Sequence, residues 1–244
     1  MIPPFLLNPV IEVSVAADAA TLAPIASSTP MPVDWTQYND SVMLLIERPK
    51  GHKIGNTICT AVLIHPRVVL TTAHCVDDAI SITVVFDVEN GTMASKKVTV
   101  LSNNIVKHAD YHPKKSLYKN DLAALLLEVA APLEQKWIRL IPAKTHLKVG
   151  DRLNRVGVGL RNGKNSRNVT DPLFAKIPSA GVLETTDVFS YFGDSGGPLY
   201  TPAHDLLALH STIDDLDGKG TPHAYAVYLP HYKVWMQEMI ERLK

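Results

Sequence analysis

The pattern that most restricts the fold is a series of short segments rich in β-branched residues, with no long helical pattern between them. They cover residues 42–46, 58–64, 67–72, 80–86 and 97–101 in the first half of the chain, and 152–158, 173–177, 206–210 and 224–229 in the second. Proline, glycine, asparagine or aspartate separates them. Such spacing is typical of antiparallel β-sandwiches and barrels and argues against alternating strands and helices.

A helix is predicted only at the C-terminal end, in HYKVWMQEMIERLK. Trp235, Met239 and Leu243 share one face there, with Met236 and Ile240 beside it. We expect this face to dock on the core. A methionine and tryptophan stripe also suits a cofactor-binding face, but packing explains it better. The proline- and charge-bearing segment near 130–145 is predicted to cross between two barrels.

Length and composition are those of an ordinary soluble globular protein. The 244 residues suit one large domain or two small ones, and 24 basic residues balance 24 acidic ones. This balance argues against a nucleic-acid partner. No apolar run reaches the roughly 18 residues of a membrane span. The first 24 residues carry Pro3, Pro4 and Pro9 and lack a basic leader, so they are a poor secretory signal and predict a flexible arm or the remnant of a pro-segment.

The cysteines and the glycosylation motifs favour secretion only weakly. An isolated pair of cysteines, Cys59 and Cys75, says little about the compartment. Asn-x-Ser/Thr acceptors occur at Asn39, Asn90 and Asn168, and chance alone gives one or two in a chain of this length.

Residues 191–199 read YFGDSGGPL and place Ser195 among glycines. A serine flanked in this way can expose its hydroxyl on a tight loop. The N–H groups of Gly193 and Ser195 then turn toward one point, where an oxyanion forms during acyl transfer. A serine hydroxyl alone is a poor nucleophile, so the chain is expected to supply a histidine as base and a carboxylate to orient it.

Two further segments contain candidates for that base and that carboxylate. His74 ends an apolar strand in LTTAHC, beside Cys75, and Asp121 leads into the apolar strand DLAALL. Half-buried there, Asp121 would accept the Nδ1 proton of a histidine and turn its other nitrogen toward the serine. Each residue alone also has a plainer interpretation, as one of ten histidines or as a turn or strand-start aspartate.

Taken in the order His74, Asp121 and Ser195, the three segments resemble the trypsin/chymotrypsin family of serine proteases, whose catalytic motifs are TAAHC, DIALL and GDSGGP. By this resemblance His74 is the general base and then acid, Asp121 orients it, and Ser195 is the nucleophile. Gly193 and Ser195 would supply the oxyanion-hole amides. Cys59 and Cys75 match the disulfide that braces the family's histidine loop.

The resemblance extends from about residue 40 to the end through further elements, namely HADY at 108–111, VGVG at 156–159, and Tyr232, Trp235, Met236 and Ile240 of the terminal helix. It implies an all-β fold of two packed six-stranded antiparallel β-barrels with a C-terminal α-helix. Residues 1–30 would be the arm, 31–135 the first barrel with His74 and Asp121, and 136–244 the second barrel and the helix, with Ser195.

A metal site is not expected. His108 and His112 have the i, i+4 spacing of helical zinc ligands, but Pro113 and the sequence between them argue against a helix. We interpret them as loop residues.

One departure from the family concerns Asp194. Family members are activated by a cleavage that creates an Ile-Val-Gly-Gly terminus, whose amine pairs with the aspartate before the serine. No such sequence occurs here, and the nearest equivalent, Ile25-Ala26-Ser27-Ser28, follows the unusual cleavage site Pro24. Because an unpaired buried carboxylate costs a few kcal/mol, either processing supplies an amine or another side chain replaces it.

The predicted substrate pocket departs from the family as well. Phe189 stands six residues before the nucleophile, where trypsin-like members have an aspartate, so cleavage after lysine or arginine is not expected. Ser211 matches the serine of the family's SWG strand, which places Ile213 at a usually small position. His223 is assigned to a second usually small wall position.

His210 leaves two interpretations of specificity open. It resembles the pocket histidine of glutamyl endopeptidases, and Ser190 would add a hydroxyl to the same substrate carboxylate. A small or medium apolar substrate side chain is preferred over this acidic alternative. A structural histidine, satisfied within the barrel, is the commonest explanation of such a residue.

The sequence thus predicts a secreted, monomeric serine endopeptidase that works through an acyl-enzyme without a cofactor or metal. Polypeptide substrates and protein inhibitors are its expected partners, with no nucleic acid and no membrane. One rival hypothesis is a protease-like binding or signalling protein with an intact triad and a pocket blocked by Phe189, Ile213 and His223. Another is a zymogen held inactive by its N-terminal arm.

Overall fold

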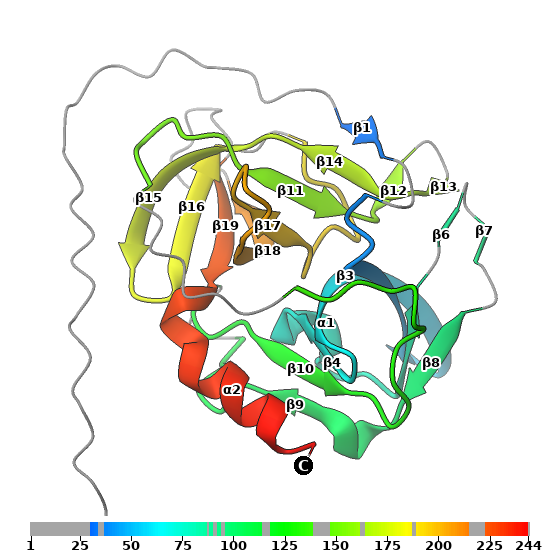
Figure 1. Cartoon of the computed structure of the whole chain (residues 1–244). Coiled ribbons are helices and arrows are strands. Elements are labelled where there is room, and N and C mark those ends of the chain that lie inside the picture. The colour runs from blue at the N-terminus through cyan, green and yellow to red at the C-terminus, as the bar shows by residue number, and fades with distance from the viewer. Residues whose placement is uncertain are drawn as a thin grey trace, which may run out of the picture.

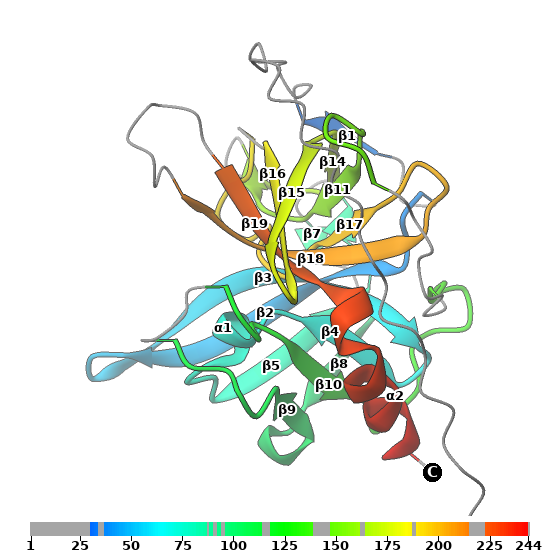
Figure 2. The same cartoon turned by 90° about the vertical axis from the view of Figure 1, so that its left-hand side faces the viewer.

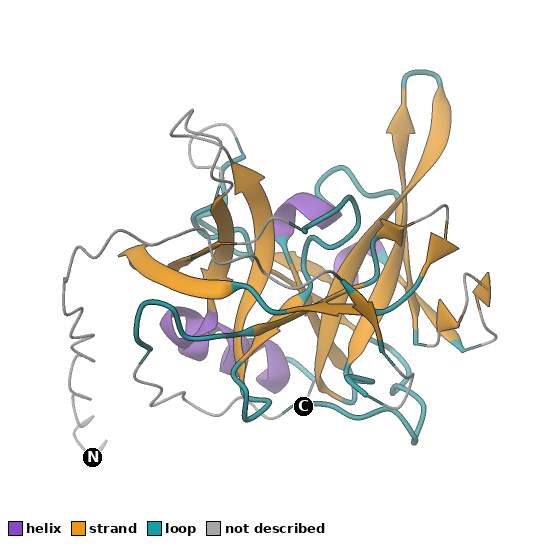
Figure 3. Cartoon of the chain, turned by 90° about the horizontal axis from the view of Figure 1, so that it is seen from above, coloured by secondary structure: helices purple, strands orange, loops and turns teal. Residues whose placement is uncertain are grey.

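The computed structural model describes residues 30–33, 37–86, 88–89, 92–93, 96–113, 118–138, 147–161, 164–186, 189–214 and 223–243. Strands make up most of the regular structure (Figure 3) and form two curled sheets that pack against each other (Figure 1). The all-β class and the chymotrypsin-like arrangement with a C-terminal helix are confirmed. Among the described residues, no helix has the length and apolarity needed to cross a membrane.

The first sheet has seven antiparallel strands in the order β8-β5-β2-β3-β4-β10-β9. Their bounds are β2 Ser41–Lys50, β3 Lys53–His65, β4 Val68–Thr71, β5 Ser81–Val85, β8 Lys97–Val100, β9 Ile105–Lys107 and β10 Ala123–Leu126. Only the 3₁₀ turn η1 (Ser102–Asn104) separates β8 from β9, which lie at opposite edges. One bent stretch of chain thus forms both edge strands of this sheet. Because β8 and β9 belong to one continuous segment, the six strands expected for the barrel appear as seven.

The second sheet has eight strands in the order β1-β14-β11-β17-β18-β19-β16-β15. Their bounds are β1 Met31–Pro32, β11 Asn154–Gly157, β14 Asn168–Thr170, β15 Leu173–Ser179, β16 Val182–Thr186, β17 Pro198–Tyr200, β18 Leu206–Asp214 and β19 His223–Tyr228. Pro172 interrupts the stretch that forms β14 and β15, because proline has no N–H for a ladder. With β1 added beside β14, six segments again account for the barrel.

Two short ribbons and one long hairpin extend from this frame. The ribbons are β6 (Val88–Glu89) with β7 (Thr92–Met93), and β12 (Leu160–Arg161) with β13 (Lys164–Asn165). The β2–β3 hairpin projects beyond the first barrel (Figure 2). Its turn needs Gly51, whose φ is +62°, a conformation that side-chain-bearing residues rarely adopt.

The central strands of the first barrel are buried on both faces. In β3, Ala61 and Leu63 point into the barrel interior, whereas Val62 and Ile64 face the second barrel. The same alternation recurs along β4 and β10. Because side chains alternate between faces, a strand between two cores reads as a continuous apolar run rather than an alternating one. This explains the sequence of residues 58–64 and lets one set of strands hold both barrels together.

The C-terminal helix α2 (Lys233–Glu241) follows the 3₁₀ turn η2 (Leu229–Tyr232) and packs over the first barrel (Figure 1). Met236 and Met239 are its buried residues, and they join the core cluster shared by the two sheets. The hydroxyl of Tyr232 accepts a hydrogen bond from the N–H of Asn120 and donates one to its side-chain oxygen, each at 3.1 Å. The docking role predicted for the helix therefore extends to the residue before Asp121.

Truncating the buried helix face tests this docking. Met239 is 1% exposed, so Met239→Ala is expected to lower the free energy of unfolding by about 2–4 kcal/mol through lost burial and a residual cavity. Val234 of the same helix is 68% exposed, so Val234→Ala should change the free energy of unfolding by less than about 0.5 kcal/mol. Urea denaturation of the two variants measures both values, and equal effects would contradict the docking.

Candidate active site

His74 is placed by the end of β4 and by a disulfide. The strand stops at Thr71, and the one-turn helix α1 (Ala73–Val76) follows, so the imidazole leaves the core and is 39% exposed. Cys75 forms a disulfide with Cys59 of β3 across a Cα–Cα distance of 6.2 Å. This cross-link ties the histidine turn to the neighbouring strand.

Asp121 lies beside His74 because β10 pairs with β4, and Ala123 stands opposite Thr71. Its Oδ1 accepts the backbone N–H of His74 at 2.8 Å, and its Oδ2 lies 2.8 Å from Nδ1 of the imidazole. Ser211 on β18 donates its hydroxyl to Oδ2 at 2.6 Å. Asp121 is fully buried, not half-buried as predicted, since these donors replace water. As a carboxylate can only accept, Nδ1 carries a proton, and in the neutral imidazole Nε2 is then the acceptor.

Ser195 lies in the loop before β17 and is held by both barrels. The N–H of Thr60 on β3 donates to its carbonyl oxygen at 2.8 Å, and the next residue, Gly196, donates to the carbonyl of His210 at 2.7 Å. The Ser195 hydroxyl donates to the carbonyl of Ser211 at 3.2 Å rather than to His74. Ser195 and His74 nevertheless line the same cleft.

The peptide between Phe192 and Gly193 has its orientation fixed by a hydrogen bond to its carbonyl. The N–H of Leu160 donates to the carbonyl of Phe192 at 3.2 Å. Because a trans peptide points its C=O and N–H in opposite directions, the N–H of Gly193 points away from Leu160. The turn requires the glycine, whose φ is +98°.

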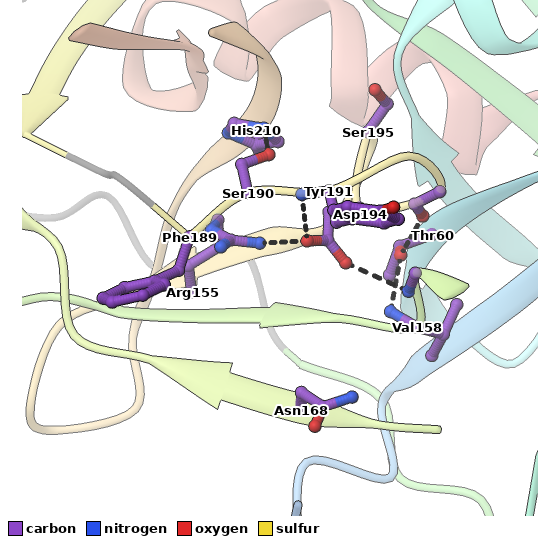
Figure 4. A network of polar contacts seen from close by, with 12 residues as sticks. Thr60, Arg155, Val158, Asn168, Phe189, Ser190, Tyr191, Asp194, Ser195 and His210 are labelled. Atoms are coloured by element: carbon purple, nitrogen blue, oxygen red, sulfur yellow. Dashed lines mark hydrogen bonds and ion pairs between the residues drawn. The ribbon is translucent and has the colours of Figure 1, made fainter. Parts of the chain in front are cut away.

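Asp194 is fully buried and paired with two arginines, Arg155 and Arg161, of which Figure 4 labels Arg155. Its Oδ2 lies 2.8 Å from Nη1 of Arg155 and 2.6 Å from Nη2 of Arg161, whose Nη1 reaches Oδ1 at 3.1 Å. The N–H groups of Gly159 and Tyr191 also donate to the carboxylate, at 3.0 and 2.9 Å. The side chains of two arginines are therefore the partners of Asp194 that the sequence did not reveal. Ile25–Ser28, the alternative source of an amine, lie outside the described residues.

These arginines set the ionisation of the carboxylate. Burial by itself raises the pKa of Asp194, but Arg155 and then Arg161 outweigh it and hold the pKa at about 2. Asp194 is thus an anion at any pH at which the protein works.

Thr60 connects this loop to the first barrel (Figure 4). Its hydroxyl donates to the carbonyl of Gly193 at 2.7 Å and accepts the N–H of Val158 at 3.0 Å. Its own carbonyl accepts the hydroxyl of Thr71 at 2.9 Å. The loop around Gly193 is therefore positioned by a residue of the opposite barrel.

A cleft of about 1110 Å³ runs between the barrels. Ser195, His74, Ser190, His210, Ser211 and Ile213 all line it, and none of its described lining residues is acidic. Ser190 Oγ lies 2.5 Å from Nε2 of His210, an imidazole that is only 2% exposed. His210 is therefore held within the wall, with its ring edge toward the cleft through Ser190.

Two residues predicted for the pocket are not among those that line the cleft. The ring of Phe189 points away from Ser195 in Figure 4, and its carbonyl accepts a hydrogen bond from Arg161 at 3.2 Å. Nδ1 of His223 lies 2.9 Å from Oε1 of the buried Glu184 on β16. Position along the chain relative to Ser195 did not reveal these contacts, because one depends on where β12 places Arg161 and the other on how β16 pairs with β19.

The glycosylation motifs differ in accessibility. Asn168 is 5% exposed, and its amide donates to Ser166, so in the folded protein it is closed to a glycosyltransferase. Asn39 donates its amide to the carbonyl of Glu134 at 3.1 Å. Asn90 lies outside the described residues.

Sequence reasoning missed Arg155, Arg161 and Thr60. A charged residue within the apolar strand RVGVG, six positions before a second arginine, was an available signal for the arginine pair. Thr60 carried no signal, because its role depends on contacts with the opposite barrel.

A two-barrel β fold in which a serine and a histidine line one cleft, with a buried aspartate bound behind the histidine, defines the class of chymotrypsin-like serine hydrolases. The model of the family described as Trypsin matches residues 36–236. The chain therefore belongs to the trypsin family of serine proteases.

Individual relatives are distant in sequence. Cathepsin G of Mus musculus is 23% identical over 227 residues, covering 84% of this chain and 82% of the relative. Among solved structures, HL collagenase has a TM-score of 0.73 at 19% identity, with 86% of this chain and 96% of that one covered. A scabies mite inactivated protease paralogue has a TM-score of 0.72 at 18% identity, covering 88% and 100%. At these identities the solved structures establish the fold alone.

The ion cluster predicts a specific acid dependence of stability. The folded pKa of Asp194, about 2, lies below the ordinary aspartate value near 3.9, so its stabilisation is complete above that value and is lost as pH falls through 2. Asp194→Asn should be less stable than the parent at pH 5–8. Urea denaturation at each pH gives the free energy of unfolding of both proteins, and the difference between them should shrink by on the order of 2 kcal/mol between pH 5 and pH 2. A difference independent of pH would contradict the pairing.

Proposed function

We propose that the chain is a serine endopeptidase in which His74, Asp121 and Ser195 form the catalytic triad. The observation that carries this proposal is the three-donor environment of Asp121, which orients the imidazole through Nδ1 and leaves Nε2 facing a cleft that contains Ser195. Membership of a family of proteases makes a polypeptide the substrate class.

The first half of the reaction forms the acyl-enzyme. Rotation about χ1 moves the Ser195 hydroxyl from the Ser211 carbonyl to Nε2 of His74, which accepts its proton as Oγ attacks the scissile carbonyl carbon. The buried Asp121 stabilises the resulting imidazolium. Nε2 then donates the proton to the leaving amine, and the peptide bond breaks.

The anion that forms on the carbonyl oxygen is stabilised by the N–H groups of Gly193 and Ser195. The Leu160 hydrogen bond to the Phe192 carbonyl fixes the Gly193 N–H before substrate binds, so little reorganisation is needed in the transition state. Water, activated by His74, then attacks the acyl carbon, and Ser195 leaves with its proton restored. These steps use the chain's own side chains and backbone amides together with water.

The pocket favours an uncharged side chain before the scissile bond. A lysine or arginine there would lose hydration without meeting a carboxylate among the described lining residues. An apolar side chain of small or medium size pays no such cost. A glutamate is the alternative, since Ser190 and His210 together offer a hydroxyl and an imidazole.

We also propose that the protein acts as a secreted monomer with protein inhibitors as partners. The disulfide supports an oxidising compartment, because such cross-links persist outside the reducing cytosol.

The second candidate function is a protease-like binding protein without catalysis. The observation in its favour is the Ser195 hydroxyl, which donates to Ser211 rather than to His74. The blockage on which this hypothesis rested involved Phe189 and His223, which do not line the cleft, and Ile213, which does.

A fluorophosphonate probe decides between the two candidates. We expect stoichiometric labelling of Ser195 in the folded chain. Ser195→Ala should abolish labelling and lower kcat by a factor of about 10⁶. Ser102→Ala, in an exposed turn of the first barrel, serves as the matched control and should retain both. A folded parent protein that neither labels nor cleaves peptides would establish the binding protein instead.

Profiling on a peptide library tests the pocket. We expect kcat/KM for alanine, valine or leucine before the scissile bond to exceed that for lysine or arginine by at least about tenfold, since the cation has no partner. A preference for glutamate that His210→Ala removes would establish the acidic alternative. Preferential cleavage after lysine or arginine would refute the proposed pocket.

A further inference from the structure

The carboxylate of Asp194 has no acceptor capacity left. Two donors, Arg161 and Gly159, contact Oδ1, and three donors, Arg155, Arg161 and Tyr191, contact Oδ2. A carboxylate offers about four lone-pair directions. Because the side chain is also completely buried, a further cation would have to displace one of these donors.

The surrounding backbone is shaped to admit this carboxylate. A Cβ at Gly157 would collide with the Asp194 carboxylate, and one at Gly159 would lie 2.6 Å from its Oδ1. Arg155 on β11 is 1% exposed and approaches from one side, while Arg161 on β12 is 15% exposed and approaches as a fork. The glycines of the VGVG segment and the arginines that flank it therefore form one built site for the aspartate.

The same site holds the loop that carries the nucleophile. The N–H of Asp194 donates to the carbonyl of Tyr191 at 3.0 Å, and the N–H of Tyr191 donates to the Asp194 side chain, which closes residues 191–194 into a turn. Leu160 binds the carbonyl of Phe192, and the adjacent Arg161 binds that of Phe189. One short strand, β12, thus contacts this loop at three places.

We propose that Arg155 and Arg161 are positioning residues that hold Asp194 in the intact chain. Through Asp194 they keep the Gly193–Ser195 turn in its anion-binding shape, so the protein needs no cleavage to assemble its oxyanion site. This inference rests on the proposed peptidase function and adds its regulation. It replaces the zymogen hypothesis, because the position that a new terminal amine would occupy is already filled.

Guanidinium and amine partners differ in how they titrate. A free α-amine loses its charge near pH 8, and at a somewhat higher pH when a carboxylate partner raises its pKa, whereas a guanidinium keeps its charge through this range. The charged groups that contact Asp194 are Arg155 of β11 and Arg161 of β12, and its other donors are backbone amides of Gly159 and Tyr191. Hence kcat/KM should stay level from pH 8 to about pH 10 in place of the fall that an amine would cause.

Labelling the uncleaved chain tests the proposal directly. The full chain, with its α-amine blocked by acetylation, is treated with the fluorophosphonate and its intact mass is measured. We expect the adduct on the full-length species, at a rate within about twofold of the unblocked chain. An adduct found only on shortened chains with a new terminus would overturn the proposal.

Substitution of Arg161 separates positioning from general stability. Arg161→Gln should lower kcat by about 10²-fold, the effect of losing one oxyanion donor, while KM changes by less than about threefold. Arg161→Lys keeps the charge and should restore part of kcat. Arg152→Gln, which breaks an exposed pair with Asp171, is the control and should leave kcat unchanged. Equal kcat values for the Arg161 and Arg152 variants would refute the role.

A double-mutant cycle gives a readout that does not depend on catalysis. In the blocked full chain, Asp194→Asn and Arg161→Gln should each lower the urea midpoint, and the double variant should be no less stable than Asp194→Asn alone. Additive losses would show that Arg161 does not hold Asp194. If coupling is present but no form of the protein labels, the arginine site stands and the peptidase function fails.

Discussion

The structure depends on one buried charge. The side chain of Asp194 is buried beneath the loop that contains both Asp194 and Ser195. Removing one partner of such a buried charge lowers the free energy of unfolding by about 3–5 kcal/mol. Two arginines and two backbone amides satisfy it here, so the loop is bound to β11 and β12 by charge-assisted hydrogen bonds. The loop of residues 191–195 is therefore tied to the places where these arginines stand.

The two barrels share the work of building the site. Asp121 of the first barrel is held by Ser211 of the second, and the loop of Ser195 is held by Thr60 of the first. The apolar cluster between the sheets stabilises these contacts between the barrels, because β3, β4 and β10 contribute side chains to this cluster as well as to the interior of their own barrel. Loss of barrel docking would therefore separate the imidazole from the hydroxyl.

The strands and the three catalytic candidates were predictable because their signals are local. Short β-branched segments specify strands, and the glycines around Ser195 permit the positive φ of Gly193 and Gly196. His74 and Asp121 were identified by the motifs around them. Contacts between distant residues left no such signal, so the burial of Asp121, the two arginines of Asp194 and the bond of Thr60 to Gly193 were not predicted. The pocket prediction placed Phe189 and His223 by position alone, and the structure puts their contacts elsewhere.

The sequence by itself determined which chemical groups are present and which backbone each can occupy: a two-barrel β fold, a disulfide candidate, and a serine on a glycine loop. Tertiary structure alone decided which groups meet. Whether Asp194 pairs with an amine or with a guanidinium depends on the packing of residues some 35 positions apart, as its contacts with Gly159 and Arg161 show. Burial strengthens whichever pairing forms, since a charge removed from water interacts strongly with the partner that the fold brings within 3 Å.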